Sequence, residues 1–331
     1  MSTLRIGLIV NPAAGRDIRR LTGGASVVDN YAKERVAECV LAGLDVVPNP
    51  PEVLAMPEKA GIADGAIETT PEEVAAGILD LPIRGSAADT RRAAARLGEE
   101  CAATVVLGGD GTSRDVALEC RDTPLLLVST GTNNVVPSAV DGTVAGAAAA
   151  LLATGAVDDR AVTDQHGMVE ARLESGASVR GLAAVELIDR SFVGTRAMVD
   201  PADLVGGIVS RANPGEIGLP GIAGALGSIS PTEPDAAFLG LREPAEAGRT
   251  VNAIAAPGMT AEVGIETHQV LGGEESTTIE AEEAVLGADG ERELEVQGEE
   301  VEFRSLPGGP RLVAFKRVFA AAAGSGVLEK G

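Results

Sequence analysis

The apolar residues in the first half of the chain are concentrated in short runs rich in valine, leucine and isoleucine. Short runs that lack polar alternation are typical of strands covered on both faces, as in a parallel sheet. A glycine, proline or asparagine follows most of them and marks a turn after the strand. We predict strands at residues 4–10, 44–47, 103–107 and 125–128.

Helical periodicity occupies several of the segments between these runs. Residues 29–42 carry apolar side chains three and four positions apart and are followed by Gly43, a residue that commonly ends helices. Asp141 or Thr143 can cap an alanine-rich helix that runs to Ala153. Further helices are predicted at residues 72–79 and 89–99.

The pattern changes after Gly155, where short β-branched segments alternate with turn residues. Asp289-Gly290 and Gln297-Gly298 are dipeptides that favour tight hairpin turns. We therefore predict a parallel α/β domain at residues 1–155 and a β-rich domain at residues 156–331. The strands predicted in the second domain are residues 167–173, 179–189, 250–255, 262–266, 277–282, 291–296 and 301–304.

A glycine cluster follows the strand at 103–107 directly. Thr112 or Ser113 can cap a helix that begins at Arg114, and the positive end of such a helix favours an anion. Glycines allow a ligand to approach the backbone closely because they have no Cβ. This segment is a predicted phosphate-binding loop, and its glycines are Gly108, Gly109 and Gly111.

Asp110 lies inside this loop, where a carboxylate would repel phosphate. The repulsion disappears if a Mg²⁺ ion bridges Asp110 to a nucleotide phosphate, or if Asp110 accepts the proton of an attacking hydroxyl. A tight turn whose aspartate accepts backbone N–H groups explains the same spacing without any chemistry. Spacing alone does not choose between these interpretations.

The loop after the first strand carries a cluster of positive charge in an otherwise acidic chain. Its arginines share one face if the segment is helical, because positions three and four apart are neighbours. They are either a guanidinium clamp for phosphate or a set of surface ion pairs. The candidate binding residues in this loop are Asn11, Gly15, Arg16, Arg19 and Arg20.

A third loop follows the strand at 125–128 and offers hydroxyl and amide groups. Such groups bind sugar hydroxyls or phosphate oxygens without adding negative charge. Loops that follow parallel strands gather at one edge of the sheet, so we expect this loop beside the other two. Its candidate residues are Gly131, Thr132, Asn133 and Asn134.

The three loops together resemble the NAD kinase and diacylglycerol kinase superfamily. Gly108-Gly-Asp-Gly-Thr112 is similar to the shared signature of that superfamily, and Asn11-Pro-Ala-Ala-Gly15 is similar to its Asn-Pro-x-x-Gly loop. Gly131-Thr-Asn-Asn134 stands where its lipid kinases carry a Gly-Thr-Gly-Asn-like loop. Residues 11–21 and 131–137 resemble more closely the acetoin-catabolism protein X group of NAD kinase-like proteins.

This resemblance implies a Rossmann-like first domain, a β-rich second domain and an active site in the cleft between them, with a C-terminal tail that can return to the first domain. It also implies ATP and Mg²⁺ as cofactors, Thr112 as a nucleotide-binding residue, NAD as the acceptor and a homo-oligomer, either dimer or tetramer.

Two segments depart from the superfamily or admit a simpler explanation. Val185-Glu186 sits where NAD kinases carry an Asn-Glu pair that holds adenosine, and the asparagine is missing. Residues 286–291 resemble a Leu-x-x-Asp-Gly-Glu segment of the lipid kinases, but a plain hairpin explains them better.

The glycine-rich stretch at 206–230 is either a substrate loop or a connection within the β-rich domain.

Composition excludes several classes of function. Acidic residues outnumber basic ones by 49 to 27, for a net charge of -22. This charge disfavours nucleic acid and anionic membranes as partners, and it is tolerated best in a salt-rich cytosol, so we expect a halophilic protein. With no Trp and one Tyr, base-stacking platforms are absent.

The chain also lacks the glycine fingerprint of dinucleotide-binding oxidoreductases after its first strand, and it lacks a Walker-type loop. No apolar run is long enough to span a bilayer, so we expect a cytoplasmic protein. We predict an ATP-dependent kinase, NAD kinase-like, in which Asp110 acts as base or metal partner. The alternatives are a kinase for another diol and a nucleotide-binding regulator without turnover.

Overall fold

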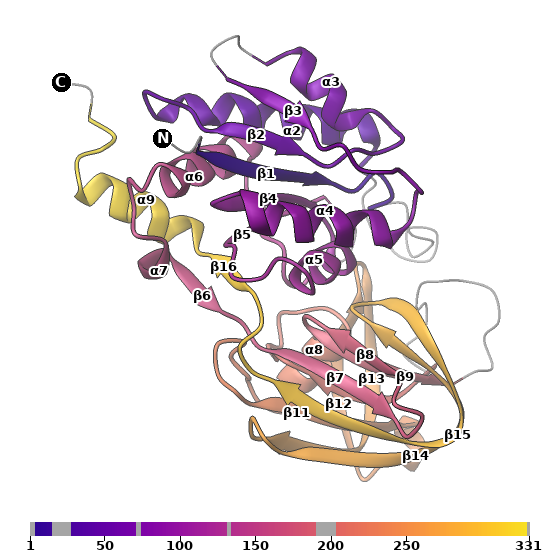
Figure 1. The fold of residues 1–331 in the computed structure, drawn as a ribbon. Helices are drawn as coiled ribbons and strands as arrows, with labels where there is room; N and C mark the ends of the chain where they lie inside the picture. The colour runs from indigo at the N-terminus through magenta and orange to yellow at the C-terminus, as the bar shows by residue number, and fades with distance from the viewer. Residues whose placement is uncertain (1–3, 15–27, 71–73, 131–133, 190–202, 330–331) are drawn as a thin grey trace.

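The computed structural model describes residues 4–14, 28–70, 74–130, 134–189 and 203–329. Two sheets lie one above the other in Figure 1, and each belongs to its own layer of structure. Six strands of the upper sheet are parallel, and its edge strand β6 runs antiparallel. Its strand order is β3 (Ala76–Ile78), β2 (Glu52–Ala55), β1 (Arg5–Val10), β4 (Ala103–Gly108), β5 (Leu125–Ser129), β16 (Arg311–Val313) and β6 (Thr163–Gln165).

Helices cover both faces of the upper sheet, which explains why its strands are apolar throughout. On β1, Ile6 and Leu8 point into one core and Ile9 points into the other, and all three are fully buried. The first core is closed by α2 (Asn30–Gly43), α3 (Ile62–Glu68), α6 (Gly142–Ala153) and α9 (Phe315–Gly324). The second is closed by α4 (Ala87–Glu100) and α5 (Asp110–Ala117).

The lower sheet is antiparallel, and strands β14 and β15 form its longest hairpin. A short helix, α8 (Leu219–Gly224), packs against it with every residue buried. The strand order is β12 (Arg249–Ala256), β13 (Met259–Leu271), β11 (Ala236–Arg242), β10 (Leu204–Val209), β9 (Ala184–Asp189), β14 (Ser276–Ala288), β15 (Glu291–Leu306), β7 (Met168–Leu173) and β8 (Ser178–Gly181).

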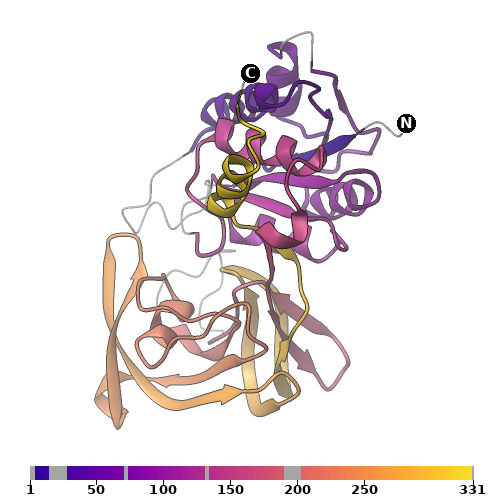
Figure 2. The ribbon, with the colours of Figure 1, turned by 90° about the vertical axis from the view of Figure 1, so that its left-hand side faces the viewer.

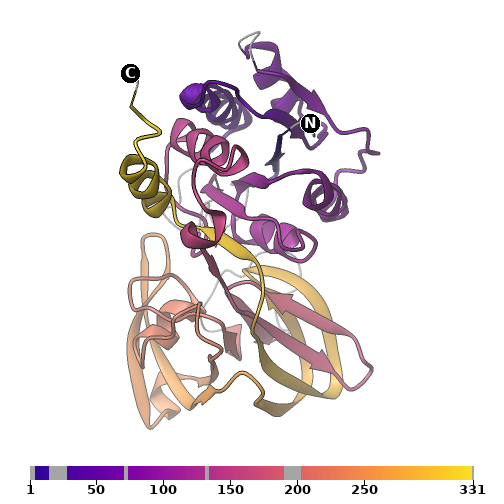
Figure 3. The same ribbon diagram turned by 60° about the vertical axis from the view of Figure 1, so that its left-hand side comes forward.

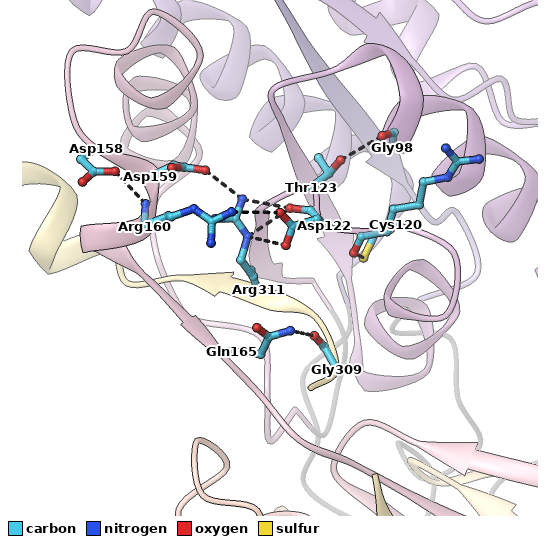
Figure 4. Close-up of polar contacts among 11 residues, drawn as sticks. Gly98, Cys120, Asp122, Thr123, Asp158, Asp159, Arg160, Gln165, Gly309 and Arg311 are labelled. Atoms are coloured by element: carbon cyan, nitrogen blue, oxygen red, sulfur yellow. Dashed lines mark hydrogen bonds and ion pairs between the residues drawn. The ribbon is translucent and has the colours of Figure 1, made fainter. Parts of the chain in front are cut away.

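The end of the chain returns to the upper layer, where α9 lies beside α6 (Figures 2 and 3). A buried arginine, Arg311, holds this return. It donates to the backbone carbonyl of Asp122 at 2.9 Å and to the carboxylate of Asp159 at 2.8 Å (Figure 4). Nearby, Gln165 donates to the carbonyl of Gly309 at 2.8 Å, so the two chain segments that join the layers run side by side.

Several local predictions were wrong. Residues 44–47 were expected to form a strand, but Leu44–Val46 is a 3₁₀ turn, and the second strand comes later because Pro48, Pro50 and Pro51 delay it. Where a helix was expected at 72–79, the described part contains strand β3. Residues 291–304 form one continuous strand, in which Gly298 takes a φ of 63° without a turn.

The predicted fold class is confirmed: a mixed α/β layer with a parallel sheet is followed by an antiparallel β-rich layer. The hairpin turn at Asp289-Gly290 is also confirmed, with φ values of 50° and 81° that suit this dipeptide. The division at 155/156 stays a prediction. No helix in the described ranges is both long and apolar enough to cross a bilayer.

Candidate active site

Hydrogen bonds join the loops that follow β1, β4 and β5. The backbone N–H of Asn11 donates to the carbonyl of Leu107 at 3.1 Å, and that of Thr130 donates to the carbonyl of Gly108 at 2.9 Å. The side-chain amide of Asn11 also donates to the hydroxyl of Thr112 at 2.7 Å. The start of each loop is therefore fixed to the central glycine loop, as the parallel order of the strands requires.

The central loop is shorter than expected, because α5 begins at Asp110. Gly109 is its N-cap residue and no side chain caps it, so the expectation that Thr112 or Ser113 would cap a helix at Arg114 was wrong. A Cβ on Gly108 would lie 2.6 Å from Cβ of Thr112, so only glycine fits there. The first N–H groups of a helix have no partner within the helix and favour an anion.

Asp110 is the first residue of α5, and its side chain is 8% exposed. Its two carboxylate oxygens accept hydrogen bonds from the backbone N–H groups of Val135 and Val136, at 2.8 and 2.9 Å. Burial raises the pKa of the Asp110 carboxyl to about 7, the N–H of Val136 opposes this rise, and the negative charge of Asp289 adds to it. The group is therefore suited to gain or lose a proton near neutral pH.

Only part of the predicted set lies within the described residues. The structure places Asn11, Thr112 and Asp110 together, with Asn134 nearby on the third loop, where its side-chain amide donates to the hydroxyl of Ser129 at 2.5 Å. Gly108 ends β4, Gly109 is the N-cap residue of α5, and Gly111 lies in the first turn of that helix. The remaining candidates lie outside the described residues: Gly15, Arg16, Arg19, Arg20, Gly131, Thr132 and Asn133.

Thr130, one of the hydroxyl residues expected in the third loop, follows β5 directly. Its side chain is 2% exposed, and its hydroxyl oxygen has no hydrogen-bond partner among the residues that the structure describes. Buried hydroxyls without a partner cost free energy and are uncommon. A ligand oxygen bound beside Gly108 would satisfy this group.

The lower layer contributes the turn between β14 and β15. The carboxylate of Asp289 accepts hydrogen bonds from the backbone N–H groups of Leu182, Ala183 and Ala184, at 2.8, 2.7 and 3.0 Å. Burial raises the pKa of Asp289, and the positive charge of Arg114 lowers it. The turn is thus fixed, and it brings a second carboxyl close enough to influence Asp110.

The residues on either side of this turn contact α5 directly. Arg114, 1% exposed, donates to the carbonyl of Ala288 at 2.6 Å and pairs with Glu293 at 2.5 Å. A Cβ on Gly111 would lie 2.7 Å from a carboxylate oxygen of Glu291, so the side chain of Glu291 lies against the third glycine of the loop. Residues 286–291, which the sequence analysis interpreted as a plain hairpin, do form a hairpin turn, and this turn also contacts the predicted phosphate loop.

Arg211, just after β10, is the residue that sequence reasoning missed. Its guanidinium pairs with Glu216 through two contacts of 2.7 Å, and its positive charge lowers the pKa of Asp110. A lone arginine and glutamate within the glycine-rich stretch at 206–230 were the available signal. Residues 219–224 of that stretch form the buried helix α8, so this part is a packed connection.

Carboxylate and carbonyl oxygens are the ligands that Mg²⁺ prefers. Each carboxylate oxygen of Asp110 accepts one N–H and keeps a lone pair that a cation could use. The donor chemistry therefore fits a divalent cation held jointly with ligand phosphates. In the described ranges, no three His, Cys, Asp or Glu side chains gather closely enough to hold a metal by themselves.

Comparison with known proteins gives matches to both layers of the chain. Residues 6–156 match the family model of the ATP-NAD kinase N-terminal domain, and residues 167–306 match that of the acetoin catabolism protein X C-terminal domain. Solved structures that match the chain include an NAD kinase from Archaeoglobus fulgidus in complex with ATP, with 13% identity, a TM-score of 0.43 and coverage of 98% of this chain and 100% of that one.

A diacylglycerol kinase from Bacillus anthracis str. Sterne is also similar, with 14% identity, a TM-score of 0.41 and coverage of 94% and 96%. Among curated proteins, acetoin catabolism protein X of Cupriavidus necator is 31% identical over 304 residues, which cover 87% of this chain and 84% of that protein. On this identity and coverage, the chain belongs to the acetoin catabolism protein X family of NAD kinase-like proteins.

Proposed function

We propose that this protein is a phosphotransferase that moves a phosphoryl group from a nucleotide, ATP in the first instance, to a hydroxyl group. The observation that carries the proposal is Asp110, a buried carboxyl with a pKa raised to about 7 at the start of a helix, inside a glycine loop. Carboxyl groups with such pKa values in anion-binding loops are suited to proton transfer during phosphoryl transfer.

In this proposal the first-turn N–H groups of α5 and the hydroxyl of Thr130 bind phosphate oxygens of the donor. The acceptor hydroxyl gives its proton to a carboxylate oxygen of Asp110 as its own oxygen forms a bond to phosphorus. The bond from phosphorus to the bridging oxygen breaks, and the nucleoside diphosphate leaves with that electron pair. Mg²⁺, when bound beside Asp110, supplies charge neutralisation for the phosphates.

The acceptor that we favour is the ribose 2′-hydroxyl of NAD. Support comes from the first-domain family model, and the absence of asparagine at Val185 weakens it. Another diol is the alternative within the same chemistry. Soluble protein in molar KCl, supplied with ATP, Mg²⁺ and NAD, should make NADP, and the absence of NADP above blank would remove the NAD kinase assignment while leaving other acceptors to be screened.

One observation favours a second function, that of a nucleotide-binding regulator without turnover. Both carboxylate oxygens of Asp110 accept backbone N–H groups, which is what a purely structural aspartate would do. The two functions separate in a titration of ATP by calorimetry combined with a turnover assay over NAD and simple diols. Binding without turnover on any acceptor would support the regulator.

A further inference from the structure

Lys33, on the first turns of α2, is the only fully buried lysine among the described residues. Its ammonium donates to the carbonyl of Pro12 at 2.9 Å and to that of Ala14 at 2.6 Å, and the side-chain oxygen of Asn30 lies at 3.5 Å. Burying an ammonium is costly unless oxygen acceptors surround it. The two carbonyls, of Pro12 and Ala14, belong to the loop after β1, so the charge is used to fix the shape of that loop.

The choice of lysine at this position is informative, because arginine supplies almost all the positive charge of the chain and only four lysines occur in it. The other described lysines, Lys59 and Lys316, are exposed. An ammonium is a compact group with three donors that point in different directions, whereas a guanidinium is a larger planar fork. The site at Lys33 presents separate oxygens around a small volume, which fits an ammonium.

The loop that Lys33 holds is connected to Asp110. With Pro12 and Ala14 fixed, the side chain of Asn11 accepts from the N–H of Ala13 at 2.8 Å and donates to the hydroxyl of Thr112 at 2.7 Å. Thr112 lies in the first turn of α5, two residues after Asp110. An uninterrupted series of contacts therefore runs from the buried ammonium on α2 to the helix turn that carries the candidate base.

We infer that Lys33 is a positioning residue for phosphate binding: it sets the loop after β1 against the first turn of α5, in the arrangement that receives the phosphates of a nucleotide. This inference rests on the proposed function for its ligand, but the positioning itself is a property of the free protein. It is carried by the contacts that Lys33 and Asn11 make.

Three variants test the role. Lys33→Met keeps the length of the side chain and removes its charge and donors. Lys33→Ala leaves a space that n-propylammonium, which matches the deleted atoms, can occupy. Val40→Ala is the matched control, because Val40 is fully buried on the same helix and packs into the core under the sheet. It should lower stability without moving the loop.

The first readout is hydrogen exchange in the protein without ligand. The N–H of Ala14 donates to the carbonyl of Asn11, so its exchange reports the shape of the loop. We expect the N–H of Ala14 to exchange faster in Lys33→Met and Lys33→Ala than in the unaltered protein, and at an unchanged rate in Val40→Ala. Added n-propylammonium should restore slow exchange in Lys33→Ala, whereas tetramethylammonium should not. Unchanged exchange at Ala14 in Lys33→Met would overturn the positioning role whether or not the protein binds nucleotide.

The second readout is the affinity for MgATP, measured by calorimetry. We expect the dissociation constant to rise about 10- to 100-fold in Lys33→Met, because losing a residue that holds binding groups in position weakens ligand binding by this order. Equal affinity in Lys33→Met and the unaltered protein would overturn the inference. If the unaltered protein binds no MgATP while the exchange result is as expected, the proposed function fails and the positioning of the loop stands.

Discussion

The guanidinium of Arg114 donates to the backbone carbonyl of Ala288 at a distance of 2.6 Å, although 174 residues separate them in the sequence. One partner belongs to the helix that begins at Asp110, and the other ends a strand of the antiparallel sheet. This contact fixes the lower layer at the predicted phosphate loop. The site therefore depends on both layers of the protein.

Replacing Arg114 with methionine should lower the free energy of unfolding by about 2 to 4 kcal/mol, because it leaves a buried carbonyl and Glu293 without their donor. The control is Arg121→Met, which removes the exposed ion pair with Glu99 and should cost less than about 1 kcal/mol. Urea unfolding of both variants measures the difference. Equal losses would show that the contact with Ala288 contributes little.

The pH dependence of stability should carry the signature of Asp110. Its pKa is raised to about 7 in the folded protein, whereas an unperturbed aspartate titrates near about 3.9. Between these values the folded state binds more protons than the unfolded state, so the free energy of unfolding falls as pH rises. Relative to Asp110→Asn, the slope should be at most about 1.4 kcal/mol per pH unit between pH 4 and 7. Parallel curves for the two proteins would contradict the raised pKa.

Arg211 should control the protonation of Asp110 from the other layer. Its positive charge lowers the pKa of Asp110, so Arg211→Gln should raise that pKa and move the acidic limb of the pH–rate profile to higher pH. Arg242→Gln removes the exposed ion pair with Glu266 in the same sheet and should leave the profile in place. An acidic limb at the same pH in Arg211→Gln and in the unaltered protein would show that Arg211 does not influence the protonation of Asp110.

Salt should stabilise this protein through the hairpin of β14 and β15, where Glu280 stands directly opposite Glu300. Like charges opposite each other on a sheet repel, and salt screens exposed charges. Glu280→Lys should therefore raise the melting temperature in low salt and reduce its dependence on KCl, whereas Glu246→Lys, on a 3₁₀ turn, should change the dependence less. Identical KCl dependence in Glu280→Lys and the unaltered protein would contradict this explanation.

Sequence patterns predicted three central strands of the upper sheet well, because a buried strand depends on local periodicity and on the glycine or asparagine that ends it, which act over a few residues. The strands at β1, β4 and β5 match their predicted ranges within one residue at either end. The hydrogen bond from Asn11 to Thr112 agrees with the expectation that the loops after parallel strands gather at one edge of the sheet.

What could not be predicted depends on contacts between distant segments. The positive charge of Arg211 reaches Asp110 from the other layer, and no local sequence pattern encodes that proximity. The same reason applies to Arg311, whose contacts to Asp122 and Asp159 hold the returning end of the chain. The strand predicted at 44–47 was wrong because a short apolar run next to prolines can equally form a tight turn.

The substitution Asp110→Asn tests the proposed chemistry most directly. It keeps the size of the side chain and one acceptor for the N–H groups of Val135 and Val136, but removes the ability to take a proton. With MgATP and an acceptor that the unaltered protein phosphorylates, we predict an affinity for ATP within a few-fold of the unaltered protein and a turnover lower by roughly 100-fold or more. Turnover that is unchanged while binding is retained would contradict the role of Asp110 as the base and leave it a structural aspartate.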